Sequence, residues 1–209
     1  MDTWQAIRDE RASLVDALAA LPRSDYGKPS LCTGWSVADV VGHITATASM
    51  TPPKFIGKFV GSGFSFDRMV NKDIHAYTDG RDPEQLVDGL RSRIDARTSP
   101  PGPTMSWLGE AIVHGEDVFR SLGDYRPHKT ENVIAVADFY TGSNTLIGSK
   151  NRIEGLTLRA TDTDWVHGSG PEVAGPAIAL VMAMTGRRAA LDDLSGAGVQ
   201  TLRERTASR

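Results

Sequence analysis

The 209-residue sequence contains a single cysteine, Cys32, and this scarcity excludes several classes of protein. One cysteine cannot form an internal disulfide, and a metal site built on Cys-x-x-Cys motifs is ruled out. A chain without disulfides fits a reducing compartment, so we expect a cytoplasmic protein. The first residues, MDTWQAIRDERASL, mix charges among apolar positions and lack the apolar core of a signal peptide.

The sequence also lacks a long apolar run and an excess of charge of either sign. No stretch approaches the roughly 20 apolar residues that a membrane-spanning helix needs. The formal net charge of −3 gives no electrostatic reason to expect a nucleic acid or an anionic membrane as a partner. Hydrophobic residues make up 40% and charged residues 23%, as in ordinary globular proteins. We therefore expect a soluble intracellular protein.

Helical periodicity dominates the first 150 residues. Apolar residues recur every three or four positions in stretches that end at proline- and glycine-rich breaks. Two helix starts are well marked. Ser36 can cap a helix with Asp39 at its third position, and Asp82 can cap a helix with proline at its first position and glutamine at its third. The predicted helices span residues 3–21, 36–50, 66–76, 83–94, 105–122 and 132–149. The glycine-rich KFIGKFVGSGFSF between two of them is predicted to be a loop.

The pattern changes after Lys150. Two segments, GLTLRATD and DWVHG, alternate apolar and polar residues as strands do. GPAIALVMAMTGRR is typical of a short buried helix, and the residues after it form a polar tail. The predicted fold class is therefore mainly α, with a helical bundle over residues 1–150 followed by a small α/β domain over residues 151–209.

The helix predicted over residues 105–122 carries Glu110 and His114 among apolar residues. Residues at i and i+4 project from the same side of a helix, so this carboxylate and this imidazole can bind one metal ion together. They can equally be a hydrogen-bonded pair at the edge of a core. Two ligands do not make a zinc site, and at least one more has to come from elsewhere in the chain.

His43 is the best third ligand among the remaining histidines. It lies in the middle of the helix predicted over residues 36–50, where a buried polar group needs a partner. A lone histidine at such a position is more often a hydrogen-bonded core residue than a ligand. Together with Glu110 and His114, however, it would form a His₂Glu set on facing helices, as in zinc sites that keep an open fourth position. The other three histidines are predicted to be exposed: His75, His128 and His167.

Two segments, LCTGWSVADVVGHI and WLGEAIVHGEDVFRSLG, resemble the actinobacterial maleylpyruvate isomerase family of mycothiol-dependent enzymes. That family is part of a larger DinB-like group of metal-binding four-helix bundles, and the C-terminal segments resemble its small sterol-carrier-like domain. The resemblance implies an antiparallel DinB-like bundle in which His43, Glu110 and His114 bind a divalent metal, usually zinc. It also implies a small-molecule thiol, mycothiol, as co-substrate at the open position, together with an electrophilic substrate.

Further residues receive roles from the same resemblance. Asp117 would orient the metal ligands, although a solvated carboxylate is an equal alternative. The family's second domain helps to close the active site and supplies an arginine, for which Arg187 or Arg188 is the candidate. Arg68 is another candidate anion contact, and a plain surface role is the alternative for each arginine. The C-terminal region also looks short for this family, which bears on the particular isomerase reaction and not on the metal site.

Several reactions and two non-catalytic roles stay open. A metal with an open position would convert a bound thiol to its thiolate, which would add to the electrophile in an isomerase or an S-transferase. Activated water would give a hydrolase instead. Cys32 is expected to be a small buried residue and not a nucleophile, because no base stands beside it in the sequence. The alternatives are a non-catalytic metal-binding module and a purely structural bundle, and a homodimer is compatible with either.

Overall fold

The computed structural model describes residues 1–144 and 147–207, and the chain divides into two compact units, Met1–Pro127 and His128–Arg209. The division falls earlier than the boundary near residue 150 predicted from the sequence. Helix α7 (Thr130–Gly142), predicted to be part of the bundle, packs against α8 and α9 and so belongs to the second unit. Within the described residues, no helix is long and apolar enough to cross a membrane.

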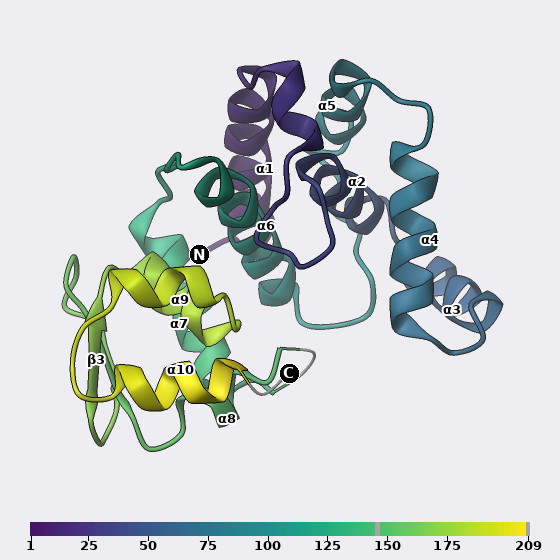
Figure 1. The fold of residues 1–209 in the computed structure, drawn as a ribbon. Coiled ribbons are helices and arrows are strands. Elements are labelled where there is room, and N and C mark those ends of the chain that lie inside the picture. Colours follow the sequence, from purple (N-terminus) through teal and green to yellow (C-terminus); the bar gives the residue numbers. More distant parts are fainter. Residues whose placement is uncertain (145–146, 208–209) are drawn as a thin grey trace. The chain divides into compact units, whose positions relative to one another are not determined.

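The first unit is a helical bundle (Figure 1). Four helices form its ring, in which α1 and α2 each pack against both α5 and α6. Their bounds are α1 (Thr3–Ala19), α2 (Val37–Ala48), α5 (Pro83–Arg91) and α6 (Thr104–Phe119). The bundle and the small sheet of the second unit confirm the predicted fold class.

The bundle core is mostly aliphatic, and it is completed by short elements at the helix ends. The 3-10 helix η1 (Arg23–Gly27) packs on α2, and η2 (Arg120–Leu122) continues α6. Both predicted helix starts are confirmed, because Ser36 and Asp82 each form a capping box with the residue three positions later. Fully buried core residues come from all four ring helices and include Leu14, Leu18, Val40, Val41, Leu90 and Val118.

Helix α4 (Phe66–Thr78) packs against α2 outside the ring. The two helices approach closely at Gly42, where an added Cβ would lie 2.6 Å from Thr78 Cγ2. A side chain at this position would force the helices apart. The glycine therefore fixes how close α4 lies to α2, next to His43.

The segment predicted to be a loop contains helix α3 (Pro52–Gly61), so that prediction was wrong. Thr51 caps the helix, and prolines occupy its first positions, where the missing N–H group costs no hydrogen bond. Gly57 and Gly61 weaken a helix by their backbone entropy, and the prediction gave them too much weight. The start signal at Thr51-Pro52 outweighs them.

The second unit combines helices with a three-stranded sheet of order β2-β1-β3. Strand β1 runs antiparallel to β2, with Leu158 opposite His167, and parallel to β3, with Leu158 opposite Val173. The strands are β1 (Thr157–Ala160), β2 (Val166–Gly168) and β3 (Glu172–Gly175). The first two match the predicted strands. The third was not predicted, because it is short and follows a turn-forming Gly-Ser-Gly-Pro.

The helices of the second unit include one that is buried on all sides. Helix α9 (Ala177–Met184) has almost no exposed residue, which explains why its sequence is apolar throughout. The predicted polar tail instead forms α10 (Val199–Ala207), which buries Leu202. The remaining elements are α8 (Ser149–Ile153) and η3 (Arg188–Asp193). Helix α7 ends at Gly142, and Leu146 of the longer helix predicted there lies outside the described residues.

Candidate metal centre

Contact between α2 and α6 brings His43, Glu110 and His114 together. One ligand atom from each residue lies within 4.8 Å of the other two. His43 Nε2 is 3.3 Å from Glu110 Oε1, and the two imidazole centroids are 4.9 Å apart. All three side chains are half-buried, so the cluster lies at the edge of the core with access to solvent.

Asp117 contacts the Nδ1 side of the His114 ring. Its Oδ2 atom is 2.9 Å from His114 Nδ1, and its side chain is 0% exposed. The carboxylate is therefore not a solvated one, which was the alternative to an orienting role. A neutral imidazole that donates its Nδ1 proton to a carboxylate carries its lone pair on Nε2, where it can bind a metal.

Cys32 also belongs to this network, which the sequence did not reveal. Its Sγ donates to Asp117 Oδ2 at 3.0 Å and lies 3.6 Å from His114 Nδ1. The thiol is half-buried, and the expectation that no base stands beside it was wrong. The backbone N–H of Leu31 donates to the carbonyl of Asp117, which fastens the loop before α2 to α6.

Two overlapping sets of ligands share His114, because Cys32, His114 and Asp117 also have ligand atoms within 4.8 Å of one another. The distances between the ligand atoms differ between the two sets. The contacts of Asp117 have ordinary hydrogen-bond lengths. The 3.3 Å between His43 Nε2 and Glu110 Oε1 is long for a hydrogen bond, and it is close to the ~3.4 Å between two ligand atoms that each lie about 2.1 Å from one tetrahedral zinc. The geometry therefore favours a metal at the first set, with the second set as its support.

Two further residues around the cluster were missed as site residues. The ring of Trp35 lies 5.0 Å from that of His43 and 6.2 Å from that of His114, so it lines both imidazoles. Arg11 is buried, and its guanidinium donates to the carbonyl of Ala96. Burial lowers the pKa of Arg11, and the Glu110 carboxylate acts in the opposite direction. The bundle thus contains a buried cation that interacts with the carboxylate of the cluster.

The arginines predicted as anion contacts lie in different units. Arg68 is an exposed residue of α4, and its Nη1 donates to the carbonyl of Ser62 in the loop between α3 and α4. Arg187 is a half-buried residue of the second unit that follows α9, and Arg188 beside it is exposed.

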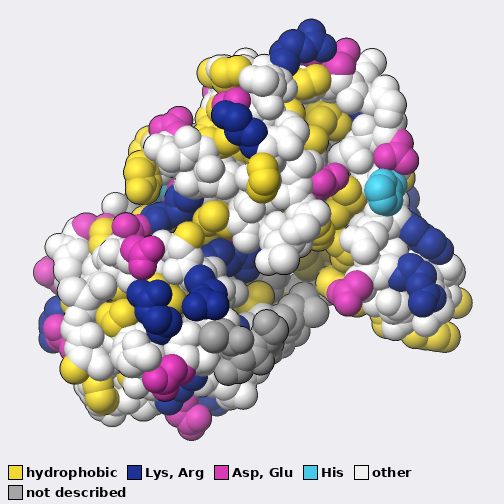
Figure 2. Space-filling view, viewed as in Figure 1, with side chains coloured by type: hydrophobic (Ala, Val, Ile, Leu, Met, Phe, Trp, Pro, Cys, Tyr) yellow, Lys and Arg dark blue, Asp and Glu magenta, His cyan; other side chains and the backbone are white. Residues whose placement is uncertain are grey.

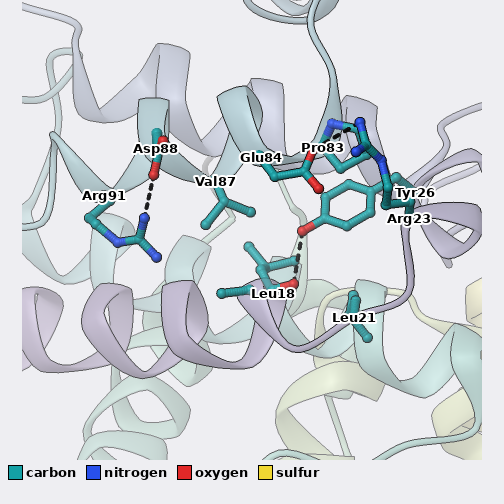
Figure 3. A pocket seen from close by; sticks show the side chains of 10 residues that line it. Leu18, Leu21, Arg23, Tyr26, Pro83, Glu84, Val87, Asp88 and Arg91 are labelled. Atoms are coloured by element: carbon teal, nitrogen blue, oxygen red, sulfur yellow. Dashed lines mark hydrogen bonds and ion pairs between the residues drawn. The ribbon is translucent and has the colours of Figure 1, made fainter.

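A separate pocket of about 230 Å³ opens between α1, η1 and α5 (Figure 3). Its charged side chains are paired with one another, Arg23 with Glu84 and Arg91 with Asp88. Tyr26 donates its hydroxyl to the carbonyl of Leu18, and burial, with a smaller effect of Glu84, raises the pKa of Tyr26 to about 12. The phenol is thus a neutral structural donor, and the pocket lacks the convergent ligands of the histidine cluster.

The fold and the cluster define the first unit as a helical bundle with a candidate divalent-metal site. Residues 7–101 match the family model described as the mycothiol maleylpyruvate isomerase N-terminal domain. The resemblance inferred from the sequence is confirmed by this match. No match was found among curated proteins.

The whole chain resembles solved structures of a mycothiol-dependent maleylpyruvate isomerase. A mutant of that enzyme aligns with a TM-score of 0.63 and 16% identity, and a second crystal structure of it aligns with 0.60 and 15%. Each match covers 94% of this chain and 92% of the other, so the alignments extend over nearly the whole of both chains. At this level of identity the likeness establishes the fold.

Proposed function

We propose that the first unit binds a divalent metal ion, zinc foremost, through His43, Glu110 and His114. We further propose that the protein uses this site to activate a low-molecular-weight thiol, mycothiol, for addition to an electrophilic substrate, as an isomerase or an S-transferase. The observation that carries the proposal is the convergence of the three side chains, with 3.3 Å between His43 Nε2 and Glu110 Oε1. The family match over residues 7–101 supports the choice of thiol.

Each residue of the cluster has a definite part in this proposal. A bound metal would act as a Lewis acid that favours the thiolate of the co-substrate at neutral pH. The two histidines would bind it as neutral imidazoles, and Asp117 keeps His114 in the tautomer that this requires. Trp35 covers both rings and so limits the positions from which a substrate can approach.

Arg68 and Arg187 stay proposed contacts for an anionic group of the thiol or the substrate. A guanidinium is suited to this task because it can bind a carboxylate through two parallel hydrogen bonds. Replacing Arg187 by alanine should raise the concentration of anionic substrate or thiol that half-saturates the reaction while the metal stays bound. Loss of the metal in this variant would argue for a structural role instead.

The decisive experiment measures metal content and metal-dependent thiol consumption together. His114→Ala should lower metal affinity by more than about 100-fold, because two remaining ligands hold zinc weakly, and it should abolish thiol consumption. His75→Ala is the matched control, since this exposed histidine pairs only with Asp79 among its described interactions. It should leave both measurements unchanged.

Three outcomes would contradict parts of the proposal. A wild-type protein that takes up no divalent metal would leave the cluster as a hydrogen-bonded structural group. Metal uptake without thiol consumption across a panel of electrophiles would leave a non-catalytic metal-binding module. Consumption that persists in His114→Ala would place the chemistry elsewhere in the chain.

A further inference from the structure

The start of helix α6 presents backbone donors that the fold leaves unused. The N–H groups of Thr104 and Met105 have no hydrogen-bond partner within the described residues, while the N–H of Ser106 donates to the carbonyl of Pro103 at 2.9 Å. Among the same residues, no side chain caps this helix and none in its first turn is acidic. The partial positive charge of a helix N-terminus is therefore not balanced by a carboxylate of the helix itself.

A second unused donor, the indole N–H of Trp107, lies beside this helix start. The side chain is 9% exposed, and its Nε1 atom is buried without a hydrogen-bond partner in the part of the chain that the structure describes. The ring edge that carries Nε1 faces the turn before α6, because Cζ2 on that edge lies 3.5 Å from the position of a Cβ added at Gly102. Buried donors without a partner are costly and rare in native proteins. The indole N–H therefore indicates a partner that the chain itself does not supply.

Trp107 shares one side of α6 with two of the proposed metal ligands. It precedes Glu110 and His114 at the spacing i, i+3 and i+7, which places the three residues along a single stripe of the helix. At a rise of about 1.5 Å per residue, the first residue of α6 lies about 9 Å along the axis from Glu110. Helical side chains lean toward the N-terminus, so the two ligands lean toward the helix start. A small molecule at the metal can therefore extend to the unused N–H groups.

The unused donors suit an anion, and a carboxylate in particular. Figure 2 shows basic and acidic side chains interspersed on the visible face, so an anion is not attracted there by a broad basic surface. Backbone N–H groups at a helix start provide a local site instead. A carboxylate has two oxygens and a single negative charge, which two backbone N–H groups and one indole N–H can satisfy. Phosphate groups carry more charge and are commonly bound by arginine or lysine.

We propose that the N–H groups of Thr104 and Met105, together with Trp107 Nε1, form a subsite for a carboxylate group. The helix dipole stabilises the negative charge, and the indole N–H adds a directional hydrogen bond. Because Nε1 is buried, a carboxylate reaches it by displacing part of the exposed turn at Pro101–Pro103. Binding at the subsite does not require the metal. Its task, to hold the carboxylate of the thiol or of the electrophile while the thiolate reacts at the metal, rests on the proposed function.

Nuclear magnetic resonance of the indole N–H groups tests the subsite in the metal-free, isotope-labelled full chain. Titration with acetate against chloride at equal ionic strength should move the Trp107 indole proton downfield until saturation, because this group gains a charge-assisted hydrogen bond. Trp165 is the internal control, since its Nε1 already donates to Asp138 Oδ1 at 2.7 Å. Its resonance should stay in place. The Trp107 resonance is identified by its absence from the spectrum of Trp107→Phe.

An isosteric replacement separates the donor from the shape of the ring. Benzothienylalanine at position 107 keeps the size of the indole and exchanges its N–H for sulfur, so it also serves if Trp107→Phe fails to fold. This protein should be at least as stable to denaturant as the wild type, because a buried donor without a partner is removed. It should bind acetate roughly tenfold more weakly, measured at the backbone resonances of Thr104 and Met105. A purely structural Trp107 would leave acetate binding unchanged.

A second arm distinguishes the two sources of the carboxylate. Mercaptohexanoate and mercaptohexanol are thiols of equal length with and without a carboxylate, and a sulfur-to-metal charge-transfer band reports their binding to the cobalt-loaded protein. If the thiol supplies the carboxylate, mercaptohexanoate should bind roughly tenfold more tightly, and Trp107→Phe should remove this preference. If the electrophile supplies it, the two thiols should bind equally, and acetate should still shift the Trp107 indole resonance in the thiol-bound protein.

Three results would overturn the subsite. Acetate could leave the Trp107 indole resonance in place, or it could shift all indole resonances alike, which is a general effect of the salt. The third result is a buried water that stays bound to the indole N–H when acetate is added. A protein that binds no metal would contradict the proposed function instead, and the acetate titration of the metal-free chain would be unaffected by that failure.

Discussion

Helices α6 and α3 depart from the usual inside-outside pattern in opposite directions. Helix α6 carries polar groups into the protein, with Glu116 and Asp117 at 2% and 0% exposure, while α3 leaves Ile56 and Val60 in solvent. The inward polar groups all find partners within the first unit: Arg120 pairs with Glu116, and Cys32 and His114 bind Asp117. The side chains of Ile56 and Val60 on α3, in contrast, stay exposed to solvent.

Each departure from the usual pattern identifies a candidate functional region of the first unit. A buried carboxylate is stable only if its partners are already in place, so the polar groups of α6 identify a preorganised internal site. An exposed apolar face gains free energy only when something covers it, so α3 identifies an external surface. Substitutions of these polar groups and their partners distinguish a role in the fold from a role at the metal site.

The largest effect is expected at Arg126, which packs over α6 at Gly115. An added Cβ at Gly115 would lie 3.0 Å from Arg126 Nη2. The same atom lies 3.2 Å from Glu10 Oε2, and both side chains are 4% exposed. Burial lowers the pKa of Arg126, and Glu10 acts in the opposite direction. The guanidinium therefore belongs to a buried ion pair between α1 and the segment after α6.

Replacing Arg126 with methionine keeps much of the volume but leaves the Glu10 carboxylate buried without this cation. We expect the free energy of unfolding to fall by about 3–5 kcal/mol in a denaturant titration. The double variant Arg126→Met with Glu10→Met should recover much of this loss, because neither charge is then buried. A loss below about 1 kcal/mol in Arg126→Met would mean that this buried ion pair is not needed for the fold.

The next effect concerns the metal. Asp117→Asn removes the charge that orients His114, and we expect it to lower metal affinity about 10- to 100-fold in a competition titration with a chromophoric chelator. Glu116→Gln is the matched control, since this neighbouring carboxylate is equally buried but pairs with Arg120. It should lower stability and leave metal affinity unchanged. Equal effects on affinity would show that Asp117 acts only through the fold.

Local signals explain which parts of this structure could be predicted. The starts of α2 and α5 follow from Ser36 and Asp82, whose capping partners lie three residues away. The shared side of Glu110 and His114 follows from helix geometry alone. Placing His43 beside them required a further inference, that the helix of His43 faces the helix of Glu110 and His114. In a bundle of few helices, only a few pairs of helices can face each other.

What was missed depends on contacts between distant residues. Cys32 lies 82 residues from His114 and 85 from Asp117 in the sequence, so no local pattern could place a base beside its thiol. The same holds for Arg11, whose interaction with Glu110 crosses from α1 to α6. Helix α3 was missed for a different reason, since its support comes from Asp73 and Lys72 on α4 rather than from its own glycine-rich sequence.

The smallest effect is expected at Cys32, whose thiol donates to the same carboxylate oxygen that accepts from His114. Cys32→Ala removes one donor to Asp117 and leaves the His114 contact, so metal affinity should fall only about three- to tenfold. Removal of a group that supports a metal ligand typically lowers affinity about 10- to 100-fold, so this loss lies at or below the low end of that range. Cys32→Ser keeps a donor and should restore most of the affinity. Equal values for alanine, serine and the wild type would mean that the thiol merely fills space.

The same pair of variants decides between the two ligand sets that share His114. If Cys32 itself binds the metal, serine will not restore affinity, and alanine will cost far more than tenfold because a ligand is lost. The cobalt-loaded wild type would then show a sulfur-to-metal charge-transfer band that disappears in Cys32→Ala. Because the 3.3 Å between His43 Nε2 and Glu110 Oε1 fits a shared metal and the contacts of Asp117 fit hydrogen bonds, we expect cobalt spectra without that band in all three proteins.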